Sequence, residues 1–251
     1  MNPNRIRRKI VDIVTRSGEG HIASSFSIVE ILLGIYKASS TTGTFSPRNI
    51  VLSKGHASYA YYAFLNEINW MTDLEFNAVG SIGSKYYGHV PFVNEDERFQ
   101  FGSGSLGHGL PFSVGVGYAR EIRNIGQPVY CIVGDGEANE GTFWESLLYI
   151  QKFNLKNLNI IIDSNESSER AIPIKKTLGE LAPAFRSLSF HTCDGHNPNI
   201  IANTLLTSSG SKLVICETKK GYPISFMMNN PAWHHKTPSP QESKILGDLL
   251  S

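Results

Sequence analysis

Apolar positions near the start of the chain recur at the spacing of an α-helix. After Pro3 they fall on one face of a predicted amphipathic helix, at Ile6, Ile10, Ile13 and Val14. The basic residues nearby are expected to form its solvated face, namely Arg5, Arg7, Arg8 and Lys9. Residues 26–38 are largely apolar and predict a second, mostly buried helix.

Further along, the pattern changes to short apolar runs of strand size, most of them separated by helix-sized stretches. The predicted strands are 49–52, 129–133, 158–162, 187–191 and 213–216. This alternation is typical of the α/β class, with a mostly parallel central sheet and helices on both faces. A helix is predicted over 106–120 in spite of its glycines, and the polar stretch 164–176 is the best candidate for a mobile loop.

Length and composition favour one soluble domain covering residues 1–251, because 251 residues with 41% hydrophobic content can bury a substantial core. The formal net charge is +1, so the chain as a whole has no attraction for nucleic acid or an anionic membrane. The start lacks the features of a secretion signal, and no apolar run is expected to reach transmembrane length. Cys131, Cys193 and Cys216 lie in or beside apolar runs, which suits reduced thiols and a cytoplasmic setting.

Asp135 stands between two glycines directly after the apolar run 129–133. In an open parallel sheet, ligands bind at the carboxyl ends of the strands. Gly134 and Gly136 let the backbone turn sharply beside a bulky anion, and amides near the next helix can donate to phosphate oxygens. A carboxylate repels phosphate unless a cation lies between them. Mg²⁺ fits this position, since a carboxylate and substrate phosphates commonly share it.

Asn165 is the candidate for a second oxygen ligand, because it follows the next predicted strand, 158–162. Neighbouring strand ends can bring Asn165 and Asp135 to the same ion. Gly-Asp-Gly alone is also an ordinary turn, but its pairing with a strand-terminal Asn favours a functional site. The pair resembles the thiamine-diphosphate fingerprint.

Further motifs resemble those of the transketolase family, and especially its split, two-chain form. They occur in family order and together cover nearly the whole chain: Gly20-His21, Ser53-Lys54-Gly55-His56, Gly88-His89, Gly104-Ser105-Leu106-Gly107-His108-Gly109, GDGEANEG and NNPAWHHK. Two departures stand out. Ile22-Ala23 replaces the family's usual Pro-Gly, and residues 166–170 are unusually polar.

The resemblance implies a ligand set for thiamine diphosphate and for Mg²⁺, or for Ca²⁺ or Mn²⁺ in its place. The implied metal ligands are Asp135, Asn165 and the main-chain carbonyl of Ser167. The implied cofactor-binding residues also include His56, Gly104, Leu106, Gly136 and His234. Of these, Leu106 resembles the apolar residue that packs on the aminopyrimidine ring.

The same resemblance implies catalytic roles for His21, His89 and Glu140. The two histidines resemble those that line the substrate channel, where imidazoles bond sugar hydroxyls and move protons. Glu140 resembles the acidic residue that links the two active sites of a dimer.

The activity implied is transfer of a two-carbon ketol unit from a ketose phosphate to an aldose, in pentose-phosphate metabolism or in a specialised sugar pathway. The family's pyrimidine-binding domain, with its essential glutamate, has no room in 251 residues. We therefore expect the partner to be a separate C-terminal transketolase subunit, in an assembly with two chains of each kind.

Three alternatives remain open from the sequence. Residues 102–107 satisfy GxGxxG, which would suit an NAD-dependent dehydrogenase, but the preceding segment is charged and irregular. Eight histidines suggest a zinc hydrolase, yet no His-Glu-x-x-His spacing supports it. The third is a non-catalytic interaction protein that keeps the fold.

Overall fold

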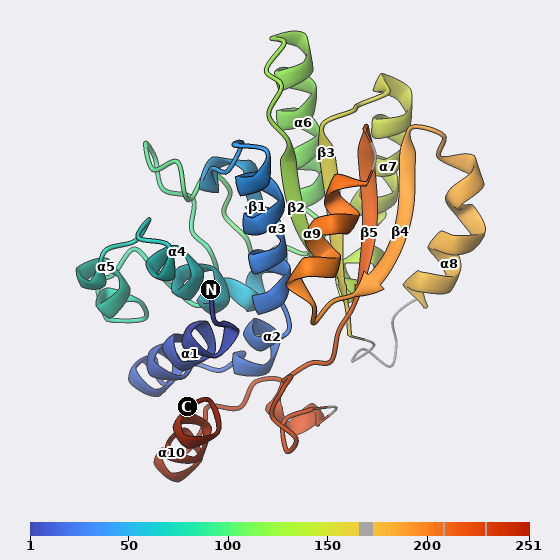
Figure 1. Cartoon of the computed structure of the whole chain (residues 1–251). Coiled ribbons are helices and arrows are strands. Elements are labelled where there is room, and N and C mark those ends of the chain that lie inside the picture. The colour runs from blue at the N-terminus through green and yellow to red at the C-terminus, as the bar shows by residue number, and fades with distance from the viewer. Residues whose placement is uncertain (166–172, 208, 229) are drawn as a thin grey trace.

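The computed structural model describes residues 1–165, 173–207, 209–228 and 230–251, and its centre is a five-stranded parallel sheet (Figure 1). The strand order is β1-β2-β3-β5-β4. The strands are β1 (Ile50–Leu52), β2 (Val129–Gly134), β3 (Leu158–Ser164), β4 (Leu188–Asp194) and β5 (Ser211–Glu217). All five strands predicted from the sequence are present, and the α/β class is confirmed.

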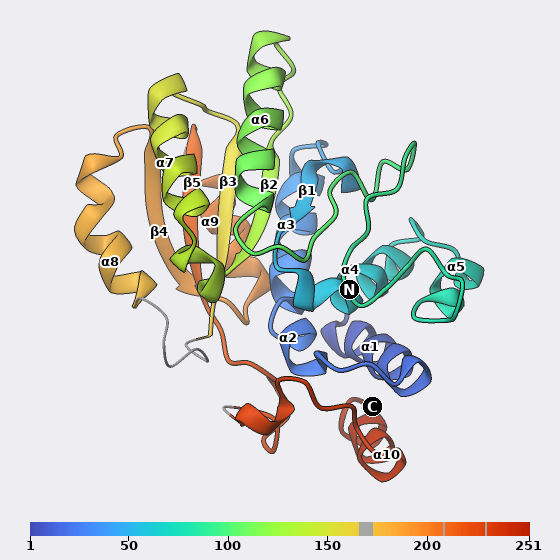
Figure 2. The ribbon, with the colours of Figure 1, turned by 180° about the vertical axis from the view of Figure 1, so that it is seen from behind.

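Helices cover both faces of the sheet. α3 (Val29–Thr41) and α9 (Pro198–Leu206) lie on the face seen in Figure 1. The opposite face, seen in Figure 2, carries α6 (Gly109–Ile122), α7 (Gly141–Phe153) and α8 (Ile174–Leu181). Alternate strand side chains point to the two faces and build two separate hydrophobic clusters. This double burial explains the nearly continuous apolar runs in the strands.

The remaining helices gather on the side of the sheet where β1 forms the edge (Figure 1). They are α1 (Pro3–Ser17), α2 (Ile22–Phe26), α4 (Ser58–Glu67), α5 (Asp73–Ala78) and α10 (Pro240–Leu249). Short 3₁₀ helices are η1 (Pro47–Asn49), η2 (Gly55–Ala57), η3 (Asp135–Asn139), η4 (Ala182–Ala184) and η5 (Pro231–Trp233). α1 begins after Asn2, whose side chain accepts from the Asn4 amide, and ends at Gly18 in the left-handed conformation.

One basic residue of α1 contradicts the prediction of a wholly solvated polar face. Arg7 is only 1% exposed, and its Nη2 lies 2.7 Å from Oε2 of the buried Glu30 on α3. Its Nε also donates to the carbonyl of Tyr222 at 3.1 Å. The guanidinium therefore fixes α1 against the core, which helical spacing alone did not reveal.

The predicted helix boundaries need three corrections. Residues 26–38 belong to two helices, α2 and α3, that meet at Ser27 and Ile28. Together α2 and α3 form the stretch Ile22–Thr41, which is long and apolar enough to span a membrane, contrary to expectation, but 89% of an 18-residue part of it is buried, as in a core helix. α6 begins at Gly109 instead of residue 106. The predicted loop 164–176 overlaps α8, which already includes residues 174–176. Residues 166–172 of that loop lie outside the described residues.

Candidate functional site

A cavity of about 270 Å³ lies at the carboxyl ends of the strands. Side chains following β1, β2, β3 and β5 reach it, because the carboxyl ends of parallel strands meet at one edge of a sheet. The predicted residues that line it are His56, His89, Gly104, Leu106, Asp135, Gly136, Asn165 and His234.

Asp135 and Asn165 are in direct contact at this edge. β2 and β3 are neighbours, and Gly134 pairs in register with Asp163. The main-chain N–H of Asn165 donates to Oδ2 of Asp135 at 3.0 Å, and the main-chain N–H of Gly136 donates to Oδ1 of Asp135 at 2.8 Å. A Cβ added to Gly136 would meet no atom within 4 Å, so space for a ligand lies beside this backbone. Carboxylate and amide oxygens with a nearby free volume fit a divalent cation and a diphosphate.

Four histidine side chains form a cluster beside the carboxylate. His21 and His56 stack with their ring centroids 4.2 Å apart, while His89 and His234 lie 5.3 and 5.8 Å from His56. Burial and the neighbouring imidazoles lower the pKa of His56 to about 3 and that of His21 to about 4. Burial and Lys220 lower the pKa of His234 to about 4. These three imidazoles are therefore neutral at pH 7 and can both donate and accept hydrogen bonds.

His235 joins the edge of this cluster, with its ring 4.7 Å from that of His21. The ligand atoms of His21, His234 and His235 lie within 4.8 Å of one another, close enough to hold a metal ion. Because His234 lines the cavity and His21 stacks on His56, the trio belongs to the same site.

The cavity is also lined by two lysines for which the sequence predicted no role. Lys54 follows β1 in the Ser-Lys-Gly-His motif, and Lys220 follows β5. Lys220 Nζ lies 2.5 Å from Nδ1 of His234. Burial and the charge of Lys54, opposed by the charge of Asp135, lower the pKa of Lys220 to about 8. The strand-end argument that found Asp135 and Asn165 applies equally to residues after β1 and β5, and could have found both lysines.

Glu137 is a further residue that the sequence did not identify. It is buried and accepts from the amides of Gly134 and Gly107 at 2.9 Å each and from Ser53 Oγ at 2.7 Å. Burial raises the pKa of its carboxyl group. Glu137 thus joins the end of β2 to the glycine-rich segment before α6.

That glycine-rich segment places Gly104 and Leu106 at the cavity and Glu140 beside it. Leu106 is 46% exposed, so one wall of the cavity is open to solvent. Gly107 has φ +76° and an added Cβ would lie 2.7 Å from that of Glu140, so a glycine is required there. Glu140 is exposed and its predicted linking role stays a prediction, whereas Ser167 lies outside the described residues.

The dehydrogenase alternative can be compared with the described structure. No strand is found between residues 79 and 108, so the GxGxxG at 102–107 lacks the preceding strand of a dinucleotide-binding unit.

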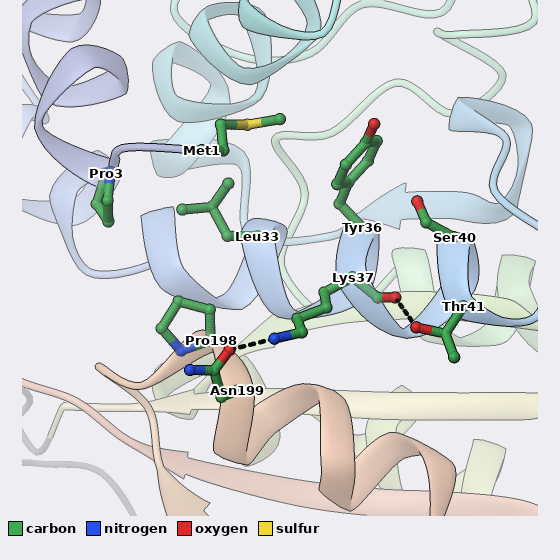
Figure 3. A pocket seen from close by; sticks show the side chains of 9 residues that line it. All are labelled: Met1, Pro3, Leu33, Tyr36, Lys37, Ser40, Thr41, Pro198 and Asn199. Atoms are coloured by element: carbon green, nitrogen blue, oxygen red, sulfur yellow. Dashed lines mark hydrogen bonds between the residues drawn. The ribbon is translucent and has the colours of Figure 1, made fainter.

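Figure 3 shows another cavity, of about 620 Å³, between the chain start, α3 and the beginning of α9. Among its described lining residues the charged side chain is Lys37, which donates to Asn199 at 2.5 Å, and neither carboxylate nor imidazole is present. It offers little acid–base chemistry.

A third cavity, of about 610 Å³, lies at the amino ends of the strands and is lined by Tyr130, Asn159 and Lys212. It lies at the opposite end of the sheet from Asp135. The cavity at the carboxyl ends remains the candidate active site.

Comparisons with known proteins show the family and the fold of the chain. Residues 2–239 match the family model described as transketolase, thiamine diphosphate binding domain. An apulose-4-phosphate transketolase subunit from Actinobacillus succinogenes is 33% identical over 96% of this chain and 91% of its own length. The transketolase of Mus musculus is 28% identical over 99% of this chain but only 41% of its own length.

A crystal structure of Campylobacter jejuni transketolase has the same fold, with a TM-score of 0.82 at 22% identity. The match covers 99% of this chain and 42% of that one. The chain thus spans about two fifths of these longer transketolases.

Proposed function

Because the chain belongs to the transketolase thiamine diphosphate binding domain family, we propose that it is the diphosphate-binding subunit of a two-chain, transketolase-type transferase. The observation that carries this proposal is the contact of Asp135 with Asn165 at a cavity that also holds two lysines and a histidine cluster. A single domain, residues 1–251, would contain this half of the site.

The residues around the cavity suit a diphosphate and a divalent cation. Asp135 and Asn165 would hold Mg²⁺, with Ca²⁺ or Mn²⁺ as substitutes, joined by the carbonyl of Ser167. The Gly136 amide, which donates to Oδ1 of Asp135 in this structure, would donate to the diphosphate once the cation takes that oxygen. The imidazoles of His56 and His234 would also donate to the diphosphate. Lys220 adds positive charge on the same side, which offsets the anionic ligand, whereas Lys54 lines the same cavity with its charge already paired with that of Asp163.

When bound, thiamine diphosphate supplies the carbon nucleophile and the electron sink for cleaving a ketose. The chain's own contribution is binding and proton handling. His21 would be neutral at pH 7 because its pKa is lowered to about 4, so it can bond the hydroxyls of a ketose donor. His89, 5.3 Å from His56 between ring centroids, would act with it, and Leu106 would support the aminopyrimidine beside Gly104.

The remaining requirements fall to a partner chain. The open wall at Leu106 is where a pyrimidine-binding subunit would complete the site, in an α2β2 assembly linked through Glu140. We propose sugar phosphates as substrates and the cytoplasm as the setting. The Actinobacillus relative is named for apulose 4-phosphate, which supports a specialised sugar pathway as well as the pentose-phosphate one.

The test is binding of thiamine diphosphate to the 251-residue chain, measured by titration calorimetry with Mg²⁺ and again with EDTA. Binding that requires the metal supports the proposal. No binding in either condition, together with binding of a nicotinamide dinucleotide, would transfer the assignment to the dehydrogenase alternative. If the chain does bind thiamine diphosphate, it should lack ketol transfer on its own. Mixing it with a pyrimidine-binding subunit should give that activity.

A further inference from the structure

Asp163 is a fully buried carboxylate beneath the cavity. It is 0% exposed, belongs to β3, and does not line the cavity itself. Its two oxygens accept hydrogen bonds from four side chains: Ser27 at 2.6 Å, Asn165 at 3.3 Å, Lys54 and Thr218. A buried carboxylate requires such donors, because burial without them costs several kcal/mol.

The four donors come from different parts of the fold. Ser27 lies between α2 and α3, Lys54 follows β1, Asn165 follows β3, and Thr218 follows β5. Asp163 therefore connects three strand ends and the α2–α3 junction under the candidate metal site. The ion pair with Lys54 also balances its charge, so the lysine is held where it faces the cavity.

The contact between Asp163 and Asn165 is compatible with one orientation of the Asn165 side-chain amide. An ionised carboxylate is an acceptor only, so it can bond the Nδ2 side of an amide but not the Oδ1 side. Nδ2 of Asn165 donates to Oδ2 of Asp163, while the Asn165 main-chain N–H donates to Asp135. Oδ1 is consequently directed away from Asp163.

We propose that Asp163 is a positioning residue, which orients the Asn165 amide so that its oxygen is presented to the divalent cation shared with Asp135. This inference rests on the proposed function of the cavity. Asp163 acts through another residue, as the hydrogen-bonding partners of metal ligands do, and such partners commonly change metal affinity by about 10- to 100-fold when replaced.

Asp163→Asn is the most direct change, because asparagine keeps the size but adds an N–H₂ group that can bond Oδ1 of Asn165 and let the amide turn over. Thr218→Val is a milder second variant, since it removes one donor to Asp163 and Thr218 does not line the cavity. Glu67→Gln is the matched control. Glu67 is a largely buried carboxylate paired with Lys9 at 2.8 Å, and it does not line the cavity.

The experiment uses the full chain, thiamine diphosphate at a fixed concentration, and Mn²⁺ as the probe, with free Mn²⁺ followed by electron paramagnetic resonance. We expect the half-saturating Mn²⁺ concentration to rise about 10- to 100-fold in Asp163→Asn, to rise less in Thr218→Val, and to stay at the wild-type value in Glu67→Gln. Thermal unfolding without metal is measured in parallel, because a purely structural role would lower the melting temperature and leave the Mn²⁺ dependence unchanged.

A folded Asp163→Asn protein with wild-type Mn²⁺ dependence overturns the inference and leaves the proposed function intact. If Asp163→Asn does not fold, Thr218→Val decides by the same criterion. Failure of the wild-type chain to bind Mn²⁺ with thiamine diphosphate would instead count against the proposed function, and the inference would fall with it.

Discussion

The main-chain N–H of Asn165 donates a 3.0 Å hydrogen bond to the carboxylate of Asp135, and this bond joins the ends of two neighbouring strands. The contact brings together two residues that are far apart in the sequence. It also makes Asp135 the residue whose loss should have the clearest effect on ligand binding.

Replacing Asp135 with Ala should abolish metal-dependent binding of thiamine diphosphate, with a loss of at least about 100-fold, since a direct ligand should matter more than its hydrogen-bonding partners. Titration calorimetry with and without Mg²⁺ measures this. Asp194→Ala is the control, because Asp194 also ends a strand but does not line the cavity. Retained metal-dependent binding in Asp135→Ala would refute the assignment of this carboxylate.

Gly34→Ala should destabilise the chain by about 1–3 kcal/mol, because overpacking a tight helix contact forces side chains or backbone to shift. An added Cβ on α3 would lie 2.5 Å from Cγ2 of Ile201 on α9. Gly115→Ala in α6 is the matched change, since its Cβ would meet nothing within 4 Å. It should stabilise by about 0.5–1 kcal/mol through helix propensity. Urea unfolding measures the change in the free energy of unfolding, which should be negative for Gly34→Ala and positive for Gly115→Ala. Equal changes in the two variants would contradict the packing argument.

Glu30→Gln should lower the free energy of unfolding by about 3–5 kcal/mol, because it leaves the buried guanidinium of Arg7 without its carboxylate partner. Arg8→Met, at an exposed position on the same helix, should change it by less than about 0.5 kcal/mol. Urea denaturation monitored by circular dichroism compares the two. A small effect of Glu30→Gln would show that the carbonyl of Tyr222 and the aromatic rings of Phe26 and Tyr222, over which the guanidinium lies, suffice to hold Arg7.

The chain without ligands should lose stability as the pH falls from about 6.5 toward 4. An unfolded histidine titrates near about 6.5, whereas burial lowers the pKa of His56 to about 3 and that of His21 to about 4 in the folded chain. Between these values the unfolded state binds more protons, so acidification favours unfolding. Above about 6.5 both states carry neutral imidazoles and this contribution to the pH dependence vanishes.

Melting temperatures measured between pH 7.5 and 4.5 test this dependence. The variant His56→Asn should show a shallower decline than wild type, because it lacks one of the histidines with a lowered pKa. The exposed His108→Asn should follow the wild-type curve. An identical pH dependence of the melting temperature in all three proteins would contradict the lowered pKa of His56.

The sequence predicted the sheet well because its strands are buried on both faces, and such strands produce long apolar runs that alternate with helices. It also predicted that Asp135 and Asn165 meet, since parallel strand ends lie along one edge. The side chain of Arg7 was predicted wrongly, because helical spacing describes one helix and not the carboxylate that the neighbouring α3 brings to it.

The supporting residues of the cavity were not predictable from local pattern. Glu137 and Asp163 look like ordinary acidic residues at strand ends, and only the tertiary structure shows that donors from distant segments surround them. Lys220 differs, because it follows a predicted strand and could have been found by the argument that found Asn165. The resemblance to transketolases supplied residue roles that the spacing alone did not.

The cavity draws its lining from Ser24 near the beginning of the sequence to His234 near its end. β1 pairs with β2 across a long intervening segment, with Ile50 opposite Tyr130, and such distant parallel pairing forms slowly. During translation, a nascent chain that already displays Gly-Asp-Gly outside the ribosome would still lack Lys220 and His234. Premature termination between Gly136 and His234 should therefore yield polypeptides that retain the signature motif yet cannot assemble a complete ligand pocket.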